Sequence, residues 1–209
     1  WTLVTDPGRG VDFDINVPYT GTIYFKGTRN HPYSNISLRM SSSHKAWGNV
    51  LSIINANNFD SITSVTQEST FTNLFSGDNS LNDVSELSFG QITSLPVRAC
   101  YMMFSSTGIT TAPDMSNITS IDDSSYCYMF VNCNQLRKGA DLSNLTSVAS
   151  DGCARMYENA TALSEVTAPN VSTWYDTYSF NQWMHSTGTY AQTKTAYVPA
   201  GVTIPESDS

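Results

Sequence analysis

The fold is decided by residues 127–136, which read Cys-Tyr-Met-Phe-Val-Asn-Cys-Asn-Gln-Leu. This stretch is one version of a unit that occurs four times, and the units begin at Phe71, Tyr101, Tyr128 and Ala154. Corresponding residues are mostly 26 or 27 positions apart, with small insertions between residues 81 and 100. A fixed period in this range is typical of a solenoid, in which each unit buries its apolar side only by stacking on its neighbours.

Alignment of the four units gives columns of matching side chains. There is an aromatic column (Phe75, Phe104, Phe130, Tyr157), three aliphatic columns (Leu81, Ile109, Leu136, Leu163; Ile92, Ile118, Leu145, Val171; Leu95, Ile121, Val148, which ends in Trp174) and a cysteine column (Cys100, Cys127 with one residue of slip, Cys153). In each unit a short extended piece, such as 136–140, is separated by a bend from a stretch typical of one helical or 3₁₀ turn. We therefore expect one short strand and one short helical segment per unit, with the strands stacked in parallel into one sheet.

The four cysteines, Cys100, Cys127, Cys133 and Cys153, raise the question of disulfides. The even number leaves disulfides open, and stacked neighbours could approach the required distance. However, three of the four share a column beside apolar columns, which favours buried free thiols that pack as small hydrophobes. A zinc knuckle is disfavoured, because Cys127 and Cys133 are too far apart and no histidine lies near them.

The segments that flank the repeats are expected to cap the open ends of the stack, so that residues 1–209 form a single domain. Its three parts are a lead-in with an N-terminal β cap (1–48), the solenoid (49–174) and a C-terminal cap with a polar tail (175–209). The N-terminal cap is predicted to be a small antiparallel sheet with strands at 11–17, 21–25 and 35–40. Residues 187–191 and 195–198 are predicted to pair as a closing hairpin. The aromatic group of Trp174, Tyr175, Tyr178 and Trp183 is interpreted as the core of this cap, with stacking on sugars as the alternative.

The composition limits the classes of partner. The formal net charge is −8 and the pI is about 4.6, which argues against nucleic acid, since phosphate binding needs a Lys/Arg patch. The same charge disfavours an anionic membrane surface. No run of about 18 apolar residues is present, so we expect no membrane insertion. The chain begins at Trp1 with no initiator Met and no signal peptide, so we expect it to be a mature or excised piece of a longer protein.

Motifs for catalysis are missing from the sequence, which contains no HExxH, P-loop, GxGxxG or GxSxG pattern. Three histidines lie far apart and carry no motif: His31, His44 and His185. Asp12, Asp14 and Asn16 have the spacing of the start of an EF-hand loop. Val17 and Ile23 stand where that loop needs Gly and Glu, so the segment is interpreted as a plain strand. We expect no catalytic residues, no cofactor and no metal.

The repeat resembles that of BspA-like leucine-rich-repeat proteins, whose unit runs roughly as Cys-Tyr, Met-Phe, Gly-Cys-Thr-Ser-Leu and Thr-Ala-Pro. The matching segments are 100–104 (Cys-Tyr-Met-Met-Phe), 109–114 (Ile-Thr-Thr-Ala-Pro-Asp) and 127–136, and the similarity extends over about residues 20–201. It implies an α/β solenoid of BspA-type leucine-rich repeats, with short parallel strands and short helical turns. The chain departs from the pattern where Gly139-Ala140 replaces Ala-Pro and where Tyr157 replaces Phe.

The resemblance also implies a role and a place. Such proteins occur on the surface of gut Bacteroidetes and other host-associated microbes, with similar domains in phage tail fibres, and they are associated with adhesion and recognition. We therefore expect a non-enzymatic extracellular module, on a cell surface or virion, that binds a host or bacterial surface protein or a glycan. One alternative is the receptor-binding portion of a phage tail fibre or other virion appendage, expected to be a trimer where an adhesin is expected to be a monomer. Another is a structural spacer with no ligand.

The residues between the apolar strand positions must point outward and form the candidate ligand face. Their chemistry varies from unit to unit, and solenoids use such faces for recognition. This face, which we refer to as the strand face, comprises Asn82, Asp83, Thr110, Thr111, Arg137, Lys138, Ser164 and Glu165.

Overall fold

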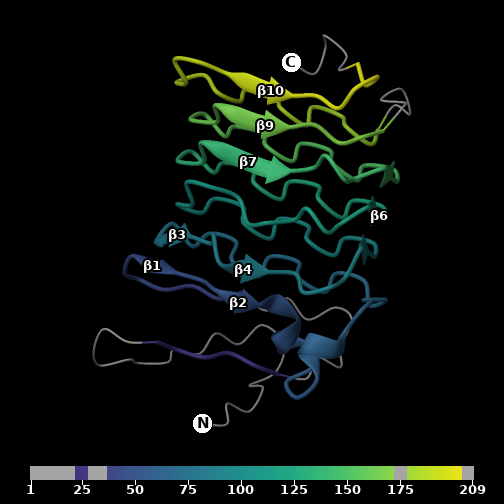
Figure 1. Ribbon diagram of the computed structural model, residues 1–209. Helices are drawn as coiled ribbons and strands as arrows, with labels where there is room; N and C mark the ends of the chain where they lie inside the picture. The colour runs from purple at the N-terminus through teal and green to yellow at the C-terminus, as the bar shows by residue number, and fades with distance from the viewer. Residues whose placement is uncertain (1–21, 28–36, 172–177, 204–209) are drawn as a thin grey trace.

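The computed structural model describes residues 22–27, 37–171 and 178–203, which form a pile of similar layers (Figure 1). Its strands are β1 His44–Lys45, β2 Gly48–Asn49, β3 Leu81–Asp83, β4 Leu87–Ser88, β5 Ser94–Leu95, β6 Ser120–Ile121, β7 Lys138–Asp141, β8 Ser147–Val148, β9 Glu165–Thr167 and β10 Thr195–Tyr197. Two 3₁₀ helices, η1 Val50–Ile53 and η2 Phe59–Ser61, are the helical elements of the described residues.

Every strand pair is parallel, as the repeat predicts. The pairs β1–β3 and β2–β4 form two small sheets, and the orders β5-β6-β8 and β10-β9-β7 form two more. Within the described residues, four small sheets therefore replace the expected single sheet. The strands are only two to four residues long. The segment around Thr111, which corresponds to β3 and β7 in the neighbouring units, forms no strand and contributes one isolated bridge, from Thr111 to Lys138.

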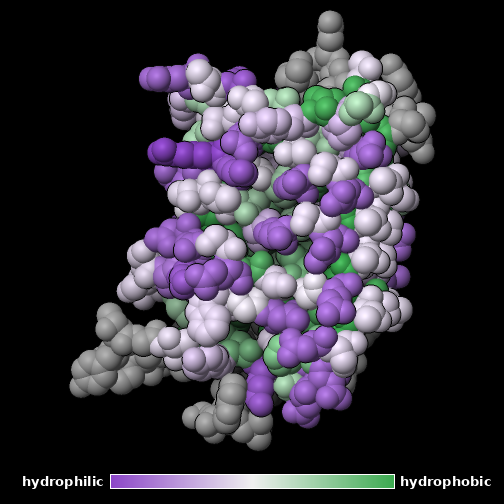
Figure 2. Space-filling model, in the orientation of Figure 1, coloured by the Kyte–Doolittle hydropathy of each residue, from purple (hydrophilic) through white to green (hydrophobic). Residues whose placement is uncertain are grey.

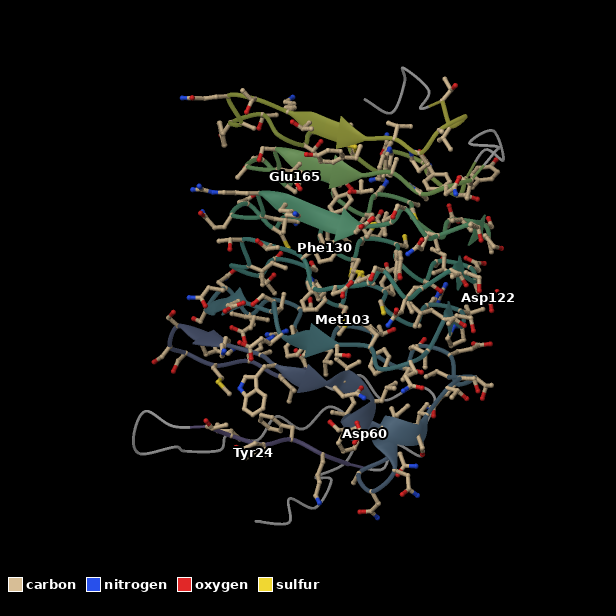
Figure 3. All side chains as sticks on the ribbon, in the orientation of Figure 1. Tyr24, Asp60, Met103, Asp122, Phe130 and Glu165 are labelled. Carbon is tan, nitrogen blue, oxygen red and sulfur yellow. The ribbon has the colours of Figure 1, made fainter. Side chains whose placement is uncertain are left out.

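The aromatic column forms a continuous stack at the centre of the pile. Phe75, Phe104, Phe130 and Tyr157 lie ring on ring, with centroids 5.4, 5.5 and 5.4 Å apart and interplanar angles of 14°, 7° and 6°. Figure 3 shows Phe130 in the interior of the array. Such pairs contribute about 0.5–1.5 kcal/mol each beyond the burial of their area. The stack favours a nearly constant period, because each unit must present one ring at the same height.

The segments predicted as helical turns have a different backbone. In residues 98–107 the odd-numbered N–H groups donate to the carbonyl three residues earlier, and the even-numbered ones donate to the next unit. Residues 124–133 repeat the same alternation. An α-helix would use its N–H groups internally, four residues apart. The alternating bonds to the next unit therefore take the place of the predicted helical turn.

This backbone places every fourth residue at positive φ, where side chains other than Gly and Asn cost about 1–2 kcal/mol. The positions form three columns: Ser69, Arg98, Ser124, Asp151; then Asn73, Met102, Tyr128, Arg155, Gln182; then Gly77, Ser106, Asn132, Asn159, Ser186. The third column holds only small residues and asparagine, which tolerate this conformation best. After Asn73, the middle column holds bulky side chains, which the backbone does not favour.

Both ends differ from the prediction. Residues 44–49 join the parallel array through β1 and β2, while residues 22–27 and 37–40 form no strand, so the antiparallel cap is not present in this part of the chain. The strand predicted at 11–17 lies outside the described residues. At the other end β10 pairs in parallel with β9, so the closing hairpin is wrong. Thr195 donates to the Ser164 carbonyl at 2.7 Å, which continues the ladder by one more layer.

A β-bulge in β7 explains two departures from the repeat at once. Lys138 lies opposite Glu165 and Asp141 opposite Thr167, so β7 contains one extra residue. The Ala140 N–H donates to the Tyr157 hydroxyl at 2.9 Å, and both residues are buried. A Cβ on residue 139 would lie 2.9 Å from that hydroxyl oxygen, which leaves room only for Gly139. Tyrosine therefore replaces phenylalanine in the last place of the stack because the bulge needs an acceptor.

Candidate binding face

The structure brings six of the eight strand-face residues into two adjacent rows. Arg137 donates its N–H to the Thr110 carbonyl at 2.9 Å, and Ser164 donates to the Arg137 carbonyl at 2.9 Å. In the neighbouring row Thr111 pairs with Lys138, which pairs with Glu165. These rows lie along one margin of the array, where Figure 2 shows hydrophilic side chains gathered near the start of β7, β9 and β10.

The other two strand-face residues face the beginning of the array. Asn82 and Asp83 lie in β3, where Asp83 pairs with Lys45 of β1. The Asn82 amide donates to the Ser43 hydroxyl at 2.6 Å. Hydrogen bonds from Ser85 hold the pKa of Asp83 below its usual value, so its carboxylate is charged at neutral pH. The strand face thus has two parts, one on β3 and one on β7 and β9.

The charged groups of the second part largely pair with each other. Lys138 Nζ lies 2.9 Å from Glu165 Oε1, and both side chains remain accessible. The hydrogen bond to Glu165, followed by its charge, raises the pKa of Lys138. Arg137 is exposed and makes no ion pair with any residue the structure describes. A ligand would therefore meet one unpaired guanidinium beside an ion pair.

Sequence reasoning missed Tyr197, which extends the strand face. It lies in β10 opposite Thr167, is 53% exposed, and is close enough to Lys138 to affect the pKa of that lysine. Glu165, Thr167 and Tyr197 share one side of the sheet, because alternate residues of a strand point to the same face. The signal in the sequence is the alternation of 195–197, which matches that of 165–167 but equally fits the predicted hairpin.

The aromatic group near the C-terminal end has one buried and one exposed member among the described residues. Trp183 is fully buried and packs edge-on against Tyr157 and Phe180, as expected for a core residue. Tyr178 is 59% exposed, while Trp174 and Tyr175 lie outside the described residues.

The cysteines are four free, buried thiols. Burial raises the pKa of each, to about 12 for Cys127 and about 11 for Cys133, so thiolate nucleophiles are not available near neutral pH. The predicted column needs one correction. Backbone bonds put Tyr126, rather than Cys127, in register with Cys100 and Cys153.

The two histidines in the described residues each lie near one carboxylate. His44 Nε2 lies 3.2 Å from the buried Asp78 carboxylate, which also accepts N–H bonds from Met40, Ser80 and Leu81. His185 lies 3.7 Å from Glu158, and His31 is outside the described residues. Within 22–27, 37–171 and 178–203 no three His, Cys, Asp or Glu residues come together to hold a metal ion.

One small hollow lies on the described part of the chain. A hollow of about 180 Å³ lies between residues 85–89 and 114–118, smaller than the roughly 300 Å³ at which small-molecule pockets begin. Among the described helices, none has the length and apolar character needed to cross a bilayer. Comparison with protein-family models, curated proteins and solved structures gave no match for this chain. The leucine-rich-repeat class therefore stays a prediction.

Proposed function

We propose that the chain is a non-enzymatic recognition module, a solenoid of BspA-type leucine-rich repeats that binds a surface protein or glycan through the strand face. One observation carries the proposal: six of the eight residues selected from sequence lie in two adjacent rows on consecutive parallel layers. Because the layers hold these side chains at a fixed spacing, the rows present a rigid surface that needs little ordering on binding.

The chemistry of the strand face suits a polar ligand. Arg137 offers an unpaired guanidinium, Lys138 and Glu165 offer both signs of charge, and Tyr197 adds an exposed ring with a hydroxyl. Arginine and tyrosine are the residues that most often dominate binding energy at surfaces. The proposed setting is extracellular, on a cell surface or virion, as the family resemblance implies.

Binding of the full chain to a glycan array and to intact host cells tests the proposal. We expect the double variant Arg137→Glu with Tyr197→Ala to lower affinity about tenfold or more, because it removes the central cation and the exposed ring. Asp60→Lys, an exposed charge reversal in η2, serves as the control and should bind like the parent chain.

Other results would favour the alternatives. If the parent chain binds nothing in either assay, the structural spacer becomes the better description. If the double variant binds as well as the parent, the ligand uses another surface. A trimer in light scattering would favour the virion-fibre alternative.

A further inference from the structure

The outer side of the turn segments presents a second surface, the turn face, which we define by Arg98, Met102, Tyr128, Asp151 and Arg155. The five residues come from three successive layers joined by backbone hydrogen bonds. All have φ between 52° and 55° except Tyr128, at 57°. The residues that alternate with them in the turns, such as Cys100 and Phe104, are buried, whereas these five are exposed or half-buried.

The centre of the turn face has the composition of a protein interface. Tyr128 packs edge-on against Tyr101 at 6.0 Å, and the Arg155 guanidinium lies 5.8 Å from the centre of the Tyr128 ring. Met102 precedes Tyr128 in the same column. Tyrosine, methionine and arginine are enriched at protein–protein interfaces relative to the rest of the surface.

The backbone gives no reason for these side chains. Met102, Tyr128 and Arg155 occupy positive-φ positions, and the equivalent positions in the third column hold Gly, Ser and Asn. Contacts inside the chain account for part of this choice, since Arg155 lies over Tyr128 and 3.4 Å from Glu158 Oε2. All three side chains nevertheless remain partly accessible. Strained positions with bulky side chains point to a role for those side chains outside the fold.

The charges of the turn face form a pattern that is complementary to itself. Arg98, Ser124 and Asp151 occupy one column in three successive layers, which gives the order positive, neutral, negative. Neither Arg98 nor Asp151 makes an ion pair with the part of the chain that the structure describes. If a second copy presents the same column in the opposite direction, Arg98 of each copy lies opposite Asp151 of the other copy.

A two-fold axis in the plane of the face, at right angles to the stack, performs this reversal. It places Arg98 opposite the partner's Asp151, and Tyr128 opposite the partner's Tyr128. Closed two-fold contacts of this kind are the commonest in homo-oligomers. The net charge of −8 makes most other contacts between two copies repulsive, so the mixed-sign face is where they approach at least cost.

We propose that the turn face is the interface of an antiparallel homodimer, centred on Tyr128 and held at both ends by Arg98 and the partner's Asp151. This state differs from the monomer and the trimer that the sequence suggests. The turn face and the strand face share no residue, so each copy keeps its own strand-face residues for a ligand, and two sites on one dimer would increase avidity.

One group in the central layer opposes the contact. Asp123 is exposed and accepts a hydrogen bond from Ser124 at 2.6 Å. The two-fold axis places it near the partner's Asp123, and like charges at an interface are unfavourable. The dimer is therefore weak, and Asp123→Asn, which keeps an acceptor for Ser124, should tighten it.

Sedimentation equilibrium of the full chain, from about 1 μM to about 1 mM, tests the dimer over the range of weak dissociation constants. We expect a monomer–dimer equilibrium in the parent chain. Arg98→Glu and Asp151→Arg should each weaken it about tenfold or more by placing like charges opposite each other. An equimolar mixture of the two variants should restore association, because the glutamate introduced in one chain then meets an arginine of the other chain.

The proposal is overturned if the parent chain stays monomeric to about 1 mM or forms a trimer. It is also overturned if the mixture of folded variants fails to associate. Should Asp151→Arg lower the melting temperature too far for use, Asp123→Asn decides alone: tighter association supports the interface, and unchanged association refutes it. Ligand binding by the strand face is measured separately, so either proposal can fail without the other.

Discussion

Two tyrosine hydroxyls are fully buried in the same core, and their removal should change the free energy of unfolding in different ways. Tyr157 Oη accepts the Ala140 N–H at 2.9 Å, whereas Tyr126 Oη has no hydrogen-bond partner among the described residues. Tyr157→Phe keeps the ring 5.4 Å from Phe130 and removes only the acceptor. The buried Ala140 N–H is then left without a partner, which costs about 1–3 kcal/mol.

The matched variant Tyr126→Phe removes a polar group that is buried without compensation. Its stability should be unchanged or higher by about 1 kcal/mol. Urea unfolding followed by circular dichroism measures both variants, with the slope against denaturant expected to stay the same. For a chain of this size, each 1 kcal/mol corresponds to a shift in melting temperature of about 2–4 °C.

The reasoning fails if both variants lose the same stability, because the bulge would then not depend on the hydroxyl. A further check uses Gly139→Ala, whose new Cβ would lie 2.9 Å from the Tyr157 hydroxyl oxygen. This substitution should be better tolerated beside Tyr157→Phe than alone, since the closest atom has gone. Additive effects in the double variant would contradict contact between the two positions.

Phe104→Ala, in the middle of the ring stack, should lower the free energy of unfolding by about 3–5 kcal/mol, and a loss below about 1 kcal/mol would contradict a packed stack. Asp78→Asn should lower the free energy of unfolding by about 2 kcal/mol, because both carboxylate oxygens of Asp78 accept N–H bonds and an amide has only one accepting oxygen. The exposed Asp60→Asn is the control for that variant and should be near neutral. The Cys127 thiol should lower stability as pH rises from its ordinary pKa of 9.0 towards about 12, because the unfolded chain loses that proton first. Cys127→Ser should reduce this pH dependence but not abolish it, because the other three thiols also have raised pKa values, and identical melting curves for variant and parent between those pH values would refute it.

The repeat period predicted the features that depend on stacking identical chemistry. The ring column and the parallel strand pairs both follow from one apolar pattern that recurs mostly every 26 or 27 residues. The turn conformation could not be predicted in the same way, because residues 98–107 give half their N–H groups to another layer. Local sequence carries no sign of that partner, so a helical turn was the natural prediction.

The prediction for the C-terminal end of the array was wrong for a related reason. Residues 195–197 alternate as either a hairpin strand or a parallel layer would, and only the position of Ser164 in space separates the two. The same error hid Tyr197 from the strand face. For Arg137 and Lys138 the prediction of side-by-side placement was easier, because a fixed period fixes which residues of successive layers are neighbours.

The alternating hydrogen bonds have a mechanical consequence. Half of the turn N–H groups point from one layer to the next, so tension between β1 and β10 along the pile would load the layer contacts rather than the turns. Each layer touches only its neighbours, and the end layers have support on one side. The chain should therefore give way from an end, one layer at a time. Each event would release 26 or 27 residues, or about 9 nm of contour length at roughly 3.4 Å per residue. A pulling trace would then show a regular staircase rather than one rupture.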